Sequence, residues 1–192
     1  MQKTLFLMCF VFFLAACQSN NSNEDTANTE IEAPLPNLPS TISTTEMRAA
    51  LGITNMVPGQ GIEAAIENAT KKIVKGTVEN GEGIFDVYKI MDDDGEELAN
   101  IYCIENDAMI EVPQSVQITS NRIATPEGLK VGDSYEKMQA TYSDFTISGS
   151  EIEGWTYARL GEVYIRVSAY NPIPDSVSVA PDDKVVFIEF EL

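Results

Sequence analysis

The chain has 192 residues, and its 30 acidic residues outnumber 12 basic ones, which gives a formal net charge of −18. An acidic surface of this size argues against binding to nucleic acid and against resting on anionic lipid headgroups. The sequence contains no histidine, which excludes Ser-His-Asp and Cys-His catalysis and removes the most common zinc ligand. We therefore expect a solvated extracytoplasmic protein that is not an enzyme, with no catalytic residue, cofactor or metal ion.

Residues 1–16 have the pattern of an export signal. Lys3 supplies a positive charge, an apolar stretch runs from Leu5 to Leu14, and two alanines then precede Cys17. This stretch of about ten residues is too short to span a hydrocarbon core of about 30 Å as a helix. The pattern thus predicts a cleaved signal peptide rather than a transmembrane helix.

The end of this segment, Leu14-Ala15-Ala16-Cys17, resembles the lipobox of bacterial lipoproteins. The resemblance implies acylation of the Cys17 thiol, with palmitate as one such acyl group, and cleavage just before it, so that acyl chains hold the mature protein on a membrane. By analogy with sorting in Gram-negative bacteria, Gln18 favours the outer membrane, on its periplasmic or its surface face. The alternative is an ordinary secretory signal that happens to end in cysteine.

Composition divides the mature chain into two parts. Residues 17–40 are rich in Asn, Ser, Thr and Glu and end in a proline-containing run, which predicts a disordered acidic tether. Residues 41–192 have the length of one domain with its own core. Once Cys17 is acylated, Cys103 is the one remaining thiol, so no intramolecular disulfide is expected. Cys103 lies in an apolar segment and is predicted to be a small core residue.

Within residues 41–192 the predicted elements come twice in a similar order. After a short helix at 45–51, apolar residues at helical spacing predict one helix beginning after Gly61 and another beginning after Gly132, where Asp133 and Glu136 suggest a capping box. Strand-like segments follow each helix, at 72–78, 83–91, 97–104 and 115–120 and then at 145–149, 155–160, 163–170 and 184–192.

This order predicts an α+β fold of two tandem helix-plus-antiparallel-meander repeats, at about 59–121 and 130–192. The helices would pack on one face of an antiparallel sheet. A single unduplicated domain whose elements repeat only loosely is the alternative.

The segment from Gly128 to Met138, GLKVGDSYEKM, opens the second predicted helix. It resembles tandem-repeat lipoprotein domains related to β-lactamase inhibitor protein and to the small outer-membrane assembly lipoproteins. The Gly-x-Pro that often follows this helix in the group is absent, and Tyr142-Ser143-Asp144 stands there instead. Members of the group act by binding proteins, so the resemblance implies a binding module, and no functional residue is carried over from it.

Two acidic clusters are candidates for chemistry. The contiguous acids of Asp92–Glu97 differ from the alternating carboxylates of a calcium loop, and Asp94-Gly95 predicts a hairpin turn, with weak cation binding as the alternative. Glu151 and Glu153 lie beside Trp155 and suggest a carboxylate-only hydrolase of glycans. Two carboxylates spaced by two on a strand share one face, however, which positions them poorly on opposite sides of a glycosidic bond.

Aromatic residues in the strand-like segments form the candidate binding surface. Tyrosine and tryptophan combine apolar area with a polar tip and are enriched in binding patches, although they are also ordinary on a half-buried sheet. The sequence thus favours an envelope protein that binds another protein or supports an assembly, held on the membrane by lipid on Cys17. A carboxylate-only hydrolase and a small-ligand-binding domain are the alternatives, and the sequence does not predict the oligomeric state. The candidate surface residues are Tyr88, Tyr102, Trp155, Tyr157 and Tyr164.

Overall fold

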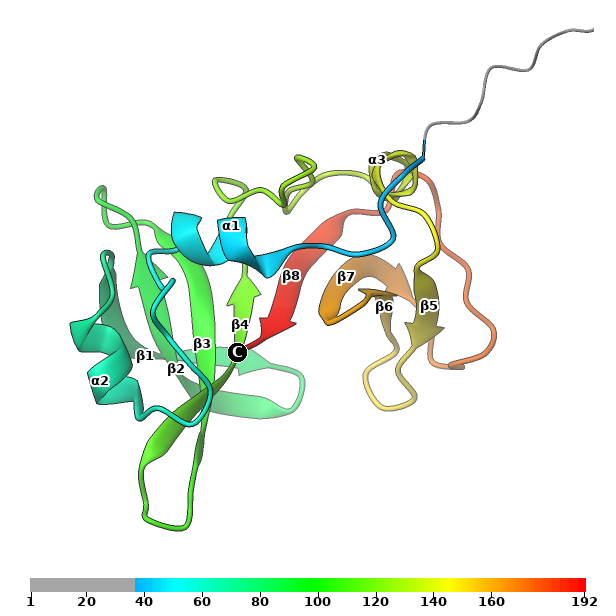
Figure 1. Ribbon diagram of the computed structural model, residues 1–192. Coiled ribbons are helices and arrows are strands. Elements are labelled where there is room, and N and C mark those ends of the chain that lie inside the picture. Colours follow the sequence, from blue (N-terminus) through cyan, green and yellow to red (C-terminus); the bar gives the residue numbers. More distant parts are fainter. Residues whose placement is uncertain (1–36) are drawn as a thin grey trace, which may run out of the picture. The chain divides into compact units, whose positions relative to one another are not determined.

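One antiparallel sheet dominates the computed structural model, which describes residues 37–192 (Figure 1). Its eight strands are ordered β1-β2-β3-β4-β8-β7-β6-β5, and every neighbouring pair is antiparallel. The predicted signal, Cys17 and nearly all of the predicted tether lie outside the described residues. The strands are β1 (Lys72–Asn80), β2 (Gly83–Met91), β3 (Glu97–Glu105), β4 (Glu111–Ile118), β5 (Thr146–Gly149), β6 (Trp155–Leu160), β7 (Val163–Tyr170) and β8 (Val185–Glu191).

The strands form where apolar and polar residues alternate. In β7, Val163, Ile165 and Val167 are fully buried, whereas Tyr164 and Arg166 between them point to the opposite face and are partly exposed. This period of two places one apolar row of each strand in the core. β6 and β7 are joined by a tight turn at Gly161, whose φ of 63° suits a hairpin turn.

Strands β4 and β8, far apart in the sequence, pair directly and hold the sheet together at its centre. Ile118 pairs with Ile188, and Val116 pairs with Phe190. Phe190 also stands opposite Val163 of β7, so its ring lies between two strands in the core. The central pairing therefore joins β1–β4 to β5–β8 through buried apolar side chains.

Three short helices and the loops beside them cover the apolar face of the sheet. The helices are α1 (Thr44–Ala50), α2 (Ile62–Glu67) and α3 (Tyr135–Thr141), and each contributes buried residues to the core. Residues outside the helices and strands also belong to the core: Leu51, Met56 and Leu129 are at most 1% exposed. Among the described residues, no helix is long and apolar enough to cross a membrane.

The predicted α+β fold of two tandem helix-plus-meander repeats is wrong. The chain forms one continuous sheet instead of two repeats, and the three helices contain only seven, six and seven residues. Helices this short cannot form a layer over eight strands. Much of the apolar face is covered by loop residues, for example Ile53 and Ile123, which are buried. Loops have no helical periodicity, so the sequence pattern did not reveal this cover.

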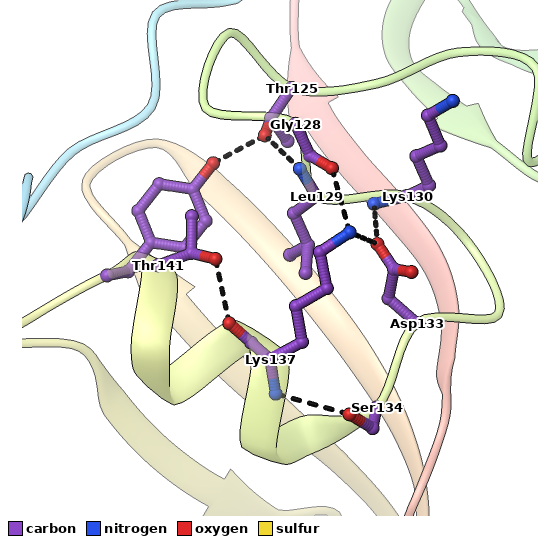
Figure 2. A network of polar contacts seen from close by, with 9 residues as sticks. Thr125, Gly128, Leu129, Lys130, Asp133, Ser134, Lys137 and Thr141 are labelled. Carbon is purple, nitrogen blue, oxygen red and sulfur yellow. Dashed lines mark hydrogen bonds and ion pairs between the residues drawn. The ribbon is translucent and has the colours of Figure 1, made fainter.

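The segment from Thr125 to Thr141 forms a polar network that fixes the start of α3 (Figure 2). The Ser134 hydroxyl accepts a hydrogen bond from the backbone N–H of Lys137, so Ser134 is the N-cap and the predicted capping box of Asp133 and Glu136 is wrong. Asp133 instead accepts from the Lys130 backbone N–H and pairs with the Lys137 ammonium group at 2.7 Å. The charged residues of this segment therefore hold a loop in place.

The hydroxyl of Tyr142, at the C-terminal end of α3, is a buried part of this region. It donates to Thr125 at 2.5 Å or to Glu127 at 2.7 Å, and the side chain is 1% exposed. Tyr142→Phe is expected to lower the free energy of unfolding by about 1–3 kcal/mol, because a buried acceptor loses its partner. Urea unfolding of the chain without residues 1–17 measures this loss. Tyr170→Phe, at a position 73% exposed, is the matched control and should change little.

Candidate binding face and its cavity

The face of the sheet opposite the core, called here the open face, carries a continuous row of polar and aromatic side chains. Asn100 pairs with Gln117, Gln117 with Glu189, and Glu189 with Tyr164. Directly opposed residues of neighbouring antiparallel strands lie on the same face. The buried residues of all three helices belong to the core on the other face. The open face thus carries side chains of four neighbouring strands, β3, β4, β8 and β7.

Four of the five predicted surface residues lie on the open face: Tyr102, Trp155, Tyr157 and Tyr164, all partly exposed. Tyr88 lies on the other face, because it pairs with Ile101 and its side chain is only 8% exposed. The Tyr88 hydroxyl donates to Glu111, which also pairs with Lys75 at 2.8 Å. These bonds hold the pKa of the Glu111 carboxyl below its usual value. The other four stay a predicted binding surface.

Arg166 is at the centre of the aromatic residues. Its guanidinium carbon lies 3.8 Å from the centroid of the Trp155 ring and 5.7 Å from that of Phe187, which is the geometry of cation–π contacts. Tyr157 lies 6.1 Å from Phe187 and 6.4 Å from Trp155, measured between ring centroids. Burial raises the pKa of Tyr157 to about 12, so its hydroxyl stays protonated. The guanidinium of Arg166 is thus surrounded by aromatic side chains.

A cavity of about 310 Å³ opens beside this cluster. Val78, Glu79 and Asn80 of β1 line it together with Trp155 and Arg166 of β6 and β7, although β1 and β6 lie near opposite edges of the sheet. The sheet must therefore coil strongly for its two ends to meet around the cavity. The remaining lining residues are Glu97, Asn100, Tyr102, Gln117, Thr119, Val186 and Phe187.

Two buried polar atoms of the cavity lining have no hydrogen-bond partner among the described residues. They are Oδ1 of Asn100, whose side chain is 1% exposed, and Nε of Arg166. The Nδ2 atom of Asn100 donates to Glu97 at 2.9 Å, so the acceptor oxygen is the free end of the amide. Buried polar atoms are normally paired, and an unpaired one calls for an explanation.

A second hollow of about 350 Å³ lies on the same face, lined by Ser148, Tyr157, Tyr164 and Glu189. It contains two of the predicted aromatic residues and no side chain of the 310 Å³ cavity. The open face thus has two separate regions. One is the aromatic hollow around Tyr164, and the other is the polar cavity around Asn100.

The carboxylates near Trp155 lack the spacing of a glycosidase pair. Glu153 accepts from Ser150, and its carboxyl also contacts that of Glu82, which raises the pKa of Glu82. Two carboxyls in direct contact are closer than the roughly 5 Å or more of a glycosidase pair. Glu151 is an exposed turn residue. In residues 37–192 no cluster of three or more acidic or cysteine side chains could hold a metal ion.

The run from Asp92 to Glu97 forms the turn between β2 and β3, where the sequence predicts one. Oδ1 of Asp92 accepts from the backbone N–H groups of Asp94 and Glu96. The carboxylates of Asp92 and Asp94 also pair with Arg122. Asp92 and Asp94 therefore stabilise the turn and bind Arg122.

Cys103 is a half-buried residue packed against the core, and burial raises its pKa to about 11. The thiolate is the reactive form, so at pH 8 the thiol should react on the order of 100-fold more slowly than in the unfolded chain. Alkylation with iodoacetamide, with and without 8 M urea, measures this ratio in a chain without residues 1–17, where Cys103 is the single cysteine. Equal rates would contradict the burial of the thiol.

Asn100 and Arg166 were not predicted from the sequence. Asn100 interrupts the apolar run of ELANIYCI, and Arg166 interrupts that of VYIRVSAY. A polar residue in the middle of an apolar strand can indicate a functional site. Without knowing which face of the sheet is open, however, it does not distinguish a cavity from solvent.

No family model matches the chain, and no curated protein matches its sequence. Among solved structures, the crystal structure of the uncharacterized protein yfeY from Escherichia coli aligns with 73% of this chain and 94% of its own chain. The two are 15% identical over the alignment, with a TM-score of 0.46. A likeness at this level carries no argument about the function of the chain.

Proposed function

We propose that the protein is a lipid-anchored binding module of the cell envelope that holds a protein partner on the open face of its sheet. The observation that carries the proposal is the presence of Tyr102, Trp155, Tyr157 and Tyr164 on that face, with the guanidinium of Arg166 stacked on Trp155. Tyrosine, tryptophan and arginine are the residues most enriched at the energetic centres of protein interfaces.

Exposed apolar residues in two adjacent turns support a protein partner. Ile84, close to the tip of the β1–β2 hairpin, is 71% exposed, and Ile152, in the β5–β6 loop, is 85% exposed. The contact between Glu82 and Glu153 brings these two turns together. Large apolar side chains grouped on a surface mark interaction sites. Because the chain is strongly acidic, we expect the complementary surface of the partner to be basic.

The membrane anchor is the second part of the proposal. The lipobox-like Leu14-Ala15-Ala16-Cys17 supports acylation of Cys17, and the polar residues that follow suit a tether to the domain. Anchoring would confine the search for a partner to the envelope, with the outer membrane favoured by Gln18.

Site-specific photo-crosslinking in living cells tests the binding face. Benzoylphenylalanine in place of Tyr164 is expected to crosslink to one envelope protein. The same group at Glu67, an exposed position on α2, should not. A Tyr157→Ser substitution introduced together with the crosslinker should weaken the crosslinked band at least tenfold, because it removes one aromatic wall of the hollow. Identical crosslinks from both positions, or none from Tyr164, would overturn the proposal.

A further inference from the structure

We propose that the cavity around Asn100 is a binding site for a neutral saccharide. This site goes beyond the proposed protein partner, since it assigns a small ligand to the cavity, although Tyr102, Trp155 and Arg166 belong to both. Three features support it: the unpaired polar atoms, the charges of the lining residues and the aromatic walls.

The unpaired atoms define what a ligand must offer. Asn100 Oδ1 requires a donor, and Arg166 Nε requires an acceptor. A hydroxyl group is the simplest group that both donates and accepts, so a ligand with several hydroxyls offers both kinds of partner. Leaving such groups unpaired in the free protein lowers stability, which is the usual compromise at a site built for a ligand.

The charges of the lining favour a neutral ligand. Glu97 is already engaged, because it pairs with Lys89 at 2.9 Å and accepts from Asn100. Glu79 also lines the cavity and opposes the entry of an anion, whereas Arg166 opposes the entry of a cation. The guanidinium of Arg166 is held over Trp155 and makes no ion pair among the described residues.

Size and aromatic walls complete the match to a saccharide. A volume of about 310 Å³ is at the lower end of small-molecule sites, which range from roughly 300 to 1,000 Å³. Tyr102, Trp155 and Phe187 line it and offer apolar surface to the C–H groups of a sugar ring. Gln117, whose Nε2 lies 3.4 Å from Glu189, adds a side-chain amide at the wall. Aromatic walls with a few fixed polar groups are the usual composition of a specific ligand site.

Trp155 is the single tryptophan of the chain and lines the cavity, so its fluorescence reports binding directly. The full lipidated chain, purified in a zwitterionic detergent without sugar headgroups, is titrated with glucose, galactose, mannose, N-acetylglucosamine and their disaccharides. At least one of these neutral sugars is expected to give a saturable change in emission. Glucuronic acid and glucosamine, which carry charge at pH 7, are expected to bind at least tenfold more weakly.

Two substitutions separate a binding site from a structural defect. Asn100→Leu and Arg166→Met should each weaken sugar binding at least tenfold. Asn100→Leu should change the urea midpoint little, because removal of an unpaired buried acceptor offsets loss of the hydrogen bond to Glu97. Arg159→Met, which removes a guanidinium 5.3 Å from the Tyr164 ring outside the cavity, is the matched control and should bind normally.

Absence of a saturable response to every neutral sugar would overturn the proposal, as would equal binding by Asn100→Leu or a preference for the charged sugars. These results leave the crosslink from Tyr164 unaffected, so the two proposals fail separately.

Discussion

Replacement of Phe190 by alanine is expected to lower the free energy of unfolding by about 3–5 kcal/mol. The Phe190 ring is fully buried, opposite Val116 on β4 and Val163 on β7. Alanine would leave a cavity at the centre of the sheet, where β-strand backbones on both sides limit collapse. Since domains of this size are stable by only about 5–15 kcal/mol, this loss is a large share of the total stability.

Urea unfolding followed by circular dichroism, on the chain without residues 1–17, measures this effect. Phe85→Ala is the control, because Phe85 is 37% exposed near the β1–β2 turn and its loss should cost far less. A difference of less than about 1 kcal/mol between the two variants would contradict the central pairing of β4 with β8.

Cys17→Ala is expected to abolish lipid attachment and to leave an uncleaved precursor. The predicted signal depends on the thiol at position 17, because acylation of that thiol is what the lipobox resemblance implies before cleavage. The variant should therefore carry residues 1–16 and lack the acyl chains. Intact mass spectrometry and phase partitioning in Triton X-114 distinguish this precursor from the mature lipoprotein.

Cys9→Ala is the matched control for this experiment. Cys9 lies within the apolar stretch of the same signal, so its replacement should leave processing and acylation normal. Normal cleavage and membrane association of Cys17→Ala would reject the lipobox and favour an ordinary secretory signal.

Most strands were predictable from the sequence, because their segments are apolar and, as in β6 and β7, alternate in burial. The segments 83–91, 155–160 and 163–170 coincide with β2, β6 and β7. The start of β4 at Glu111 was missed, since Pro113 argues against a strand interior. In the structure Pro113 lies next to the register shift between Tyr102 and Cys103, where a missing N–H group is tolerated.

The arrangement of the sheet was not predictable in the same way. Pairing of Ile118 with Ile188 depends on long-range packing, which no local pattern encodes. Two similar series of elements suggested two repeats, each with its own helix over its own strands. The observed continuous sheet corrects this prediction, because its core also depends on loop residues such as Leu129.

The residue types of the candidate site could be predicted from the sequence, but the face of the sheet on which each residue lies could not. Tyr88 and Tyr102 lie in similar strand segments, yet their pairing partners place them on opposite faces of the sheet. The cavity around Asn100 was missed because it arises from the coiling of the sheet, which brings β1 toward β6. Such curvature depends on the whole set of strands.

The central position of β8 has a consequence for how the protein folds. β8 is the last strand of the described chain, yet it lies between β4 and β7. Contacts between residues this distant in sequence raise the contact order, which slows folding. While the chain emerges N-terminus first, β4 keeps an unpaired edge until β8 arrives, and an unpaired edge invites aggregation. We therefore expect a newly made chain to be prone to aggregation until its C-terminal strand is in place.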